Sequence, residues 1–203
     1  MEPFRAQLPA STFGPVATPP RTDGDSSLRD NLRRAQQLLK DAGWEYRDGA
    51  LRNAKGEPFV LEYLDSNEGG ARVVTPWARN LEKIGVQLKF RPVDFALYQQ
   101  RLQKFEFDIT SLAYQGTHNP GQEFADLFGS KAADQEDSGN HSGVKNVAVD
   151  ALITRITSAK TKAQLLPACR ALDRVFAHQV SIAQPSLAAY GGMLSGFAKR
   201  QAL

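Results

Sequence analysis

The strongest constraint on the fold is a regular alternation of strand-like and helix-like segments in the middle of the chain. Short apolar or alternating segments bounded by turn residues are typical of strands, and apolar side chains at three- and four-residue steps are typical of helices. The predicted strands are residues 59–64, 86–90 and 105–110, and the predicted helices are 73–84 and 95–102. Strands joined by helices cross over in a right-handed sense. The sequence therefore predicts an α/β fold, with a mixed or mostly parallel sheet flanked by helices.

Further segments lie on both sides of this alternation. Residues 28–42, 149–156 and 165–176 each carry an apolar stripe with helical spacing. Residues 1–27 contain five prolines, so we expect an extended, proline-rich leader or connection without helices. Residues 115–146 lack periodicity and are rich in small polar residues. A loop of that length in a compact domain is usually functional or mobile.

Composition limits the class of protein. A chain of 203 residues suits a single domain. The net charge of +3 is spread along the chain, without a basic cluster interleaved with aromatic residues, so we expect no nucleic-acid partner. No stretch approaches the roughly 18 apolar residues of a membrane span. The N-terminal residues lack the pattern of a signal peptide, so the chain as written is expected to stay in the cytoplasm.

The sequence contains no motif for catalysis or metal binding. The single cysteine, Cys169, lies in an apolar helical pattern and is better explained as a core residue than as a nucleophile. The three histidines, His118, His141 and His178, are not spaced as metal ligands. Neither a nucleophile elbow nor a phosphate-binding loop is present. We therefore predict that the chain is not an enzyme and binds no cofactor and no metal.

Four short segments together carry a resemblance to a known family. Residues 33–44 (RRAQQLLKDAGW) form the end of a predicted helix, and residues 81–86 (LEKIGV) form a step from helix to strand. Residues 93–98 (VDFALY) belong to a predicted helix that is followed by Phe107 and Asp108. Residues 146–153 (NVAVDALI) form the start of a further helix. In this order and spacing, they resemble the family 5 extracellular solute-binding proteins. These are the peptide-, dipeptide- and nickel-binding receptors of bacterial ABC importers.

Further segments resemble one branch of that family. Residues 117–123 (THNPGQE) and 128–134 (FGSKAAD), with the leader 13–24, are similar to the branch associated with uptake of oligopeptides and microcin-type peptide antibiotics. The resemblance implies a non-catalytic, peptide-binding lobe of a periplasmic receptor, which would work with an ABC importer permease. Such receptors are about three times longer, so we expect a C-terminal lobe whose N-terminal lobe is missing. Residues 28–180 would form the lobe, and 181–203 a hinge-return tail.

Candidate ligand-binding residues come from two sources. The resemblance places two groups in loops that face the ligand cleft, although ordinary turn residues would look the same: Asn119 and Gly121, then Asn140, His141, Ser142 and Gly143. Their small polar groups suit the backbone of a peptide. On the predicted helix 95–102, the Arg101 side chain could bind a ligand carboxylate or lie on a solvated face of the helix. The Tyr98 side chain could line the cleft or belong to the core. Gln115 follows a predicted strand, where open α/β sheets bind ligands.

A second function remains open from the sequence. The surface that would meet the missing lobe is expected to be apolar, and exposed apolar patches promote association. The chain would then be a truncated, stand-alone protein-interaction module without ligand binding.

Overall fold

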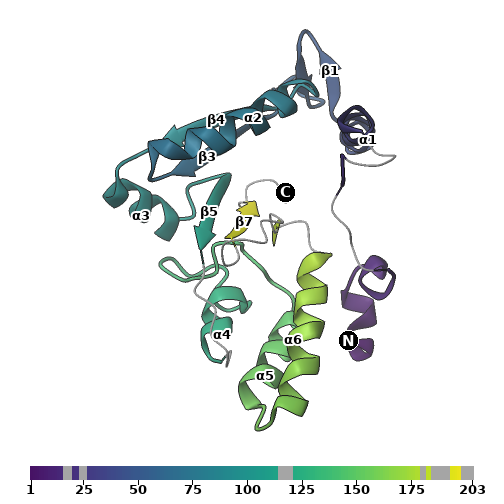
Figure 1. The fold of residues 1–203 in the computed structure, drawn as a ribbon, viewed down its shortest axis with the longest axis vertical. Helices are drawn as coiled ribbons and strands as arrows, with labels where there is room; N and C mark the ends of the chain where they lie inside the picture. The colour runs from purple at the N-terminus through teal and green to yellow at the C-terminus, as the bar shows by residue number, and fades with distance from the viewer. Residues whose placement is uncertain (16–19, 23–26, 114–120, 179–181, 184–192, 198–203) are drawn as a thin grey trace. The chain divides into compact units, whose positions relative to one another are not determined.

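The computed structural model describes residues 1–15, 20–22, 27–113, 121–178, 182–183 and 193–197 (Figure 1). The chain divides into two compact units, which are described separately. One unit comprises Met1–Ala17 and Ala96–Leu203, and the other comprises Thr18–Phe95. The predicted division into residues 1–27, 28–180 and 181–203 remains a prediction.

The unit Thr18–Phe95 contains the parallel part of the fold. Strand β3 (Val60–Asp65) leads through the 3-10 helix η3 (Glu68–Gly70) and helix α2 (Ala71–Glu82) to strand β4 (Gln87–Pro92). β3 and β4 pair in parallel, with Leu61 opposite Leu88. Buried side chains from both strands, from α2 and from the connection between α2 and β4 contribute to the core here: Leu61, Tyr63, Leu64, Val74, Ile84, Val86 and Leu88. This strand–helix–strand element confirms the predicted α/β class.

Two further elements complete this unit. Helix α1 (Leu28–Asp41) begins at Ser27, whose hydroxyl accepts a hydrogen bond from the Asp30 amide at 3.1 Å. Strands β1 (Glu45–Arg47) and β2 (Ala50–Arg52) form an antiparallel hairpin. The turn between them has Asp48 and Gly49 at φ values of 51° and 77°, as tight hairpin turns require.

The other unit has an antiparallel sheet and a helical layer. Helix α3 (Phe95–Gln103) precedes strand β5 (Ile109–Ala113), which pairs antiparallel with β7 (Met193–Phe197), and β7 pairs antiparallel with β6 (Ile182–Ala183). β5 begins later than the predicted strand 105–110. The chain turns first, because Phe105 adopts a φ of 54° that a strand does not allow.

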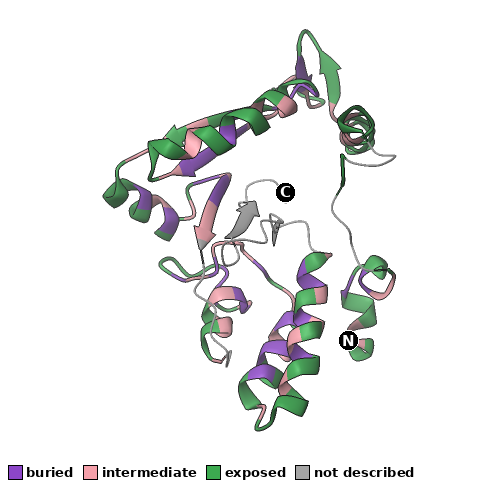
Figure 2. Cartoon of the chain, viewed as in Figure 1, coloured by how far each residue is buried: buried purple, intermediate pink, exposed green. Residues whose placement is uncertain are grey.

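Helices α5 (Val147–Ser158) and α6 (Lys162–Ala177) pack on each other through apolar faces, as their stripes predict (Figure 2). The core between them includes Val149, Leu152, Ile153, Ile156, Leu172, Val175 and Phe176. Helix α4 (Glu123–Phe128) was not predicted, and its Phe128 joins this core, with its ring centroid 4.7 Å from that of Phe176. The prediction of an unbroken loop over 115–146 was therefore wrong for these residues.

The N-terminal segment also packs on this helical layer. Two 3-10 helices, η1 (Glu2–Gln7) and η2 (Ala10–Phe13), occupy residues that were expected to be extended and free of helix. Proline is compatible with a first helical turn, since the amide it lacks has no partner there. Leu8 is buried in the core of α5 and α6, and Arg174 of α6 donates hydrogen bonds to the Thr12 carbonyl, at 2.6 Å, and to the Gly14 carbonyl.

Candidate ligand-binding site

A buried asparagine organises the loop between α4 and α5. The Asn140 side chain is fully buried, and its amide nitrogen donates to the carbonyls of Gly129 and Val144, both at 3.0 Å. Its amide oxygen accepts hydrogen bonds from the Val144 amide and the Ser142 hydroxyl, both at 3.1 Å. These four bonds occupy the hydrogen-bonding capacity of the side chain. Asn140 therefore holds the loop in place and has no polar group left for a ligand.

His141 follows this anchor and is only partly exposed. Its ring lies edge-on to the Phe105 ring, with the centroids 6.2 Å apart, and its Nδ1 is buried without a hydrogen-bond partner among the described residues. Desolvation lowers the pKa of His141, although the nearby Asp126 carboxylate and a hydrogen bond with the Leu102 backbone act in the opposite direction. Burial disfavours the charged imidazolium, so the neutral ring is the favoured form.

The loop is also joined to the end of α3. The Gln103 side chain donates to Asp137 Oδ1 at 2.8 Å, and the Asp137 amide donates to the Gln103 carbonyl at 3.1 Å. At Gly139 the backbone passes close to Asp126, because a Cβ atom there would lie 2.5 Å from Asp126 Oδ2. These contacts hold residues 137–143 against α3 and α4.

The two candidates on α3 differ in exposure. Tyr98 is buried, and its hydroxyl lies 3.2 Å from Thr110 Oγ1 on β5, so it is a core residue that links helix and strand. Arg101 is half-buried on the same helix, one turn further along. Of these two side chains, Arg101 is the more exposed.

The remaining candidates have different positions. Gln115 and Asn119 lie outside the described residues. Gly121 precedes α4, and its amide donates to Glu123 Oε1 at 3.0 Å. Ser142 is half-buried, with its hydroxyl donated to Asn140. Gly143 adopts a φ of 66°, which glycine accommodates without strain.

The structure thus brings the 140–143 loop together with the end of α3 and the C-terminal end of α4. Sequence reasoning missed Phe105, Asp126 and Asp137, which surround His141 and its loop. The only local signal was the alternation around Phe105, which suggested a strand. The described part of the chain contains no group of three His, Cys, Asp or Glu side chains arranged to hold a metal ion. No helix among the described residues has the length and apolar character of a membrane span.

Comparison with known families now identifies the chain. Residues 5–136 match the family described as bacterial extracellular solute-binding proteins, family 5. The chain belongs to this family. Its members bind solutes without catalysis, so the prediction that the chain is not an enzyme is confirmed.

Curated relatives support the same assignment. A probable peptide-binding protein of Agrobacterium fabrum, YejA, is 38% identical over 176 residues, which are 86% of this chain and 29% of that protein. A peptidoglycan-binding protein of the same organism, YepA, is 30% identical, over 83% of this chain and 27% of that protein. The chain thus spans less than a third of the length of these relatives.

Solved structures confirm the fold. The oligopeptide-binding protein AppA of Bacillus subtilis, in complex with a nonapeptide, matches with a TM-score of 0.62 at 19% identity, over 82% of this chain and 33% of that one. A Thermotoga maritima oligopeptide-binding protein bound to mannohexaose matches with a TM-score of 0.60 at 20% identity, over 72% of this chain and 29% of that one. The predicted lobe fold of a periplasmic binding protein is therefore confirmed.

Proposed function

We propose that the chain is a ligand-binding lobe of a peptide receptor that serves a bacterial ABC importer in the periplasm. The observation that carries the proposal is membership of the family together with the 38% identity to a probable peptide-binding protein. The ligand is a short peptide, and the partners are the other lobe of the receptor and the importer permease. The oligopeptide branch of the family is the proposed origin.

The proposed contact surface comprises Arg101, Gly121, His141, Ser142 and Gly143, with Gln115 and Asn119 retained from the sequence. The Arg101 guanidinium suits a peptide carboxylate, which it can bind through two parallel hydrogen bonds. The hydroxyl oxygen of Ser142 still has lone pairs that can accept a hydrogen bond from a peptide amide. Asn140 and Tyr98 support this surface from behind, because both are buried and hydrogen-bonded within the fold.

One lobe alone is expected to bind peptide weakly. In receptors of this kind, two lobes close on the ligand, and a single wall buries less of it and supplies fewer converging contacts. The dissociation constant of the 203-residue chain should therefore be weaker than micromolar. A micromolar or tighter value would contradict the half-cleft interpretation.

Amide-resolved NMR of the chain, titrated with a pool of short peptides, tests the proposal. Chemical-shift changes should be confined to residues 98–101, 115–121 and 140–143. The same pool with amidated C-termini should shift the Arg101 signal less. In the Arg101→Gln variant, the unmodified pool should likewise produce smaller shifts in residues 98–101. Arg155→Gln, on the exposed side of α5, is the matched control. A folded spectrum without any shift would count against peptide binding.

Exposed apolar side chains favour one alternative, a stand-alone interaction module. Val73, Phe95 and Leu166 are 76%, 64% and 50% exposed, more than is usual for large apolar residues. If these residues drive self-association, light scattering should show oligomers that dissociate in Val73→Ser and Phe95→Ser variants. A monomer across the concentration range would exclude self-association.

A further inference from the structure

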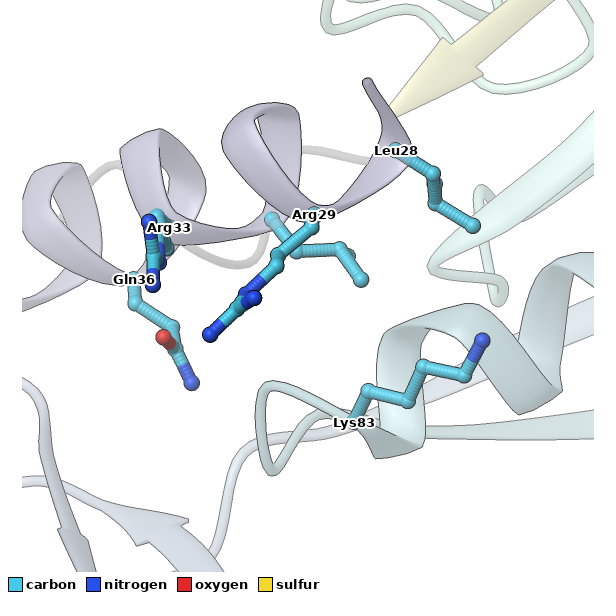
Figure 3. Close-up of a pocket in the computed structure, with 6 residues that line it drawn as sticks. Leu28, Arg29, Arg33, Gln36 and Lys83 are labelled. Atoms are coloured by element: carbon cyan, nitrogen blue, oxygen red, sulfur yellow. The ribbon is translucent and has the colours of Figure 1, made fainter. Parts of the chain in front are cut away.

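A pocket of about 540 Å³ lies between α1 and the C-terminal end of α2 (Figure 3). Its volume falls within the range of roughly 300–1,000 Å³ found for small-molecule sites. Its lining residues are Leu28, Arg29, Leu32, Arg33, Gln36 and Lys83. None of them belongs to the proposed peptide surface.

The helical repeat of α1 brings five of these residues to one side. Leu28, Leu32 and Gln36 are spaced four residues apart, and the two arginines each follow one of the leucines. Residues four apart on a helix lie above one another, so this spacing makes a continuous strip. Lys83 closes the pocket from the end of α2, where it is the C-cap residue (Figure 3).

The pocket is lined by three cationic side chains and no carboxylate. The Arg29 side chain has no hydrogen bond or ion pair within the described part of the chain. Lys83 donates to the neutral Asn80 side chain at 2.9 Å. Arg33 has a carboxylate nearby, at 3.8 Å in Asp30, but both side chains are more than 60% exposed. Exposed pairs of this kind contribute little. The positive charge of the pocket therefore remains largely uncompensated.

The apolar part of the pocket is accessible as well. α1 has no fully buried residue, and Leu28 is 39% exposed. Leu32, one turn later, is half-buried. A ligand that covers these two side chains removes apolar surface from water, which favours binding. No aromatic residue lines the pocket, so base stacking does not contribute to recognition.

We propose that this pocket binds a small amphiphilic anion. Arg29, Arg33 and Lys83 bind its carboxylate or phosphate group, and Leu28 and Leu32 contact a short aliphatic part. Guanidinium groups match the geometry of both anions, and Lys83 adds a point charge. Each methylene group buried against the leucines strengthens binding by up to about fourfold. This site is independent of the proposed peptide function.

Titrations of the chain with octyl phosphate and octanoate, followed by amide NMR below their micelle concentrations, test the proposal. Both ligands should shift the amide signals of residues 28–36 and 82–84 in a saturable way. The ligand with the lower dissociation constant carries the preferred anionic group. Inorganic phosphate should bind more weakly than octyl phosphate, because it lacks the apolar contact. The neutral octyl glucoside should produce no saturable shift there. Equal binding of inorganic and octyl phosphate, or shifts spread over exposed apolar residues elsewhere, would overturn the proposal.

Matched variants separate the pocket from general charge effects. Arg29→Gln with Arg33→Gln should weaken octyl phosphate binding by about 3- to 10-fold, from the loss of two exposed charge contacts. Arg34→Gln with Lys40→Gln removes the same charge from α1 outside the pocket and should change affinity less than twofold. Leu28→Gln should weaken octyl phosphate and leave inorganic phosphate unchanged. Equal losses in the two double variants would contradict a defined site.

Discussion

Replacement of Asn140 by alanine should destabilise the unit that contains the α4–α5 loop. The substitution removes four side-chain hydrogen bonds and leaves two buried backbone groups without their partner, the carbonyl and the amide of Val144. The Gly129 carbonyl still accepts a hydrogen bond from the Ala132 amide at 3.1 Å. An unsatisfied buried group costs about 1–3 kcal/mol. Water can enter the space left by the side-chain amide and bind the Val144 groups, so the low end of this range applies.

The expected loss is therefore about 2 kcal/mol in the free energy of unfolding, from about 1 kcal/mol for each of the two Val144 groups. For a chain of this size, that corresponds to a decrease of about 4–8 °C in Tm. Chemical unfolding followed by circular dichroism measures the loss, and hydrogen exchange at the Val144 amide shows whether it arises in this loop.

Asn146→Ala is the matched control in the same unit. Asn146 caps α5, with its side-chain oxygen accepting from the Ala148 amide at 2.8 Å, but it is only half-buried. Loss of an N-cap costs about 1 kcal/mol. The Asn140 variant should therefore lose roughly twice as much stability as the control. If the two variants lose the same amount, burial does not make Asn140 the anchor of the loop, and the argument is wrong.

Three further predictions concern other side chains of this unit. Because burial lowers the pKa of His141, the unfolded state takes up its proton first as the pH falls below about 6.5. The stability contributed by the neutral ring is thus present above that pH and lost below it. Denaturant midpoints measured at successive pH values should show this loss, and the loss should be smaller in the His141→Phe variant. Arg174→Gln should lower stability by about 1–3 kcal/mol and speed cleavage of the N-terminal segment in limited proteolysis, whereas the exposed Arg170→Gln should do neither. Burial raises the pKa of the Cys169 thiol, so this thiol should react with a disulfide reagent at pH 8 more slowly than glutathione does. Equal reaction rates of Cys169 in the native and the unfolded protein would contradict this prediction.

The elements that depend on local periodicity were predictable from the sequence. The structure buries the apolar stripe of α5 and most of that of α6, and it buries Leu88 in the alternating segment of β4. In α2 only Val74 is buried, and Val73 and Trp77 of its stripe stay exposed. The α/β class follows from the β3–α2–β4 order alone. Around Phe105, the alternation placed the start of the strand too early, because Phe105 adopts a φ of 54° and Phe107 is buried from the irregular segment before β5. A short local pattern cannot distinguish these two ways of burying one aromatic residue.

The packing of the N-terminal segment could not be predicted, because its partners are distant in the sequence. The prolines predicted an extended segment without helices, which was wrong for Glu2–Gln7 and Ala10–Phe13. The bonds that hold it come from Arg174, on a helix at the other end of the chain, and the contact that buries Leu8 is with α5 and α6. Nothing in residues 1–15 specifies either partner.

The candidate site shows a similar limit of sequence reasoning. Asn140, His141 and Ser142 all have side chains that can bind a peptide, and their sequence does not rank them. Their positions in the fold do, since Asn140 is committed to backbone groups of Gly129 and Val144, whereas the hydroxyl oxygen of Ser142 retains lone pairs. A residue type therefore states which hydrogen bonds a side chain can make, but the fold determines how many of them remain for a ligand. In this loop Asn140 can make the most hydrogen bonds, but all of them are used within the fold. Its replacement should therefore weaken ligand binding only by changing the positions of neighbouring residues.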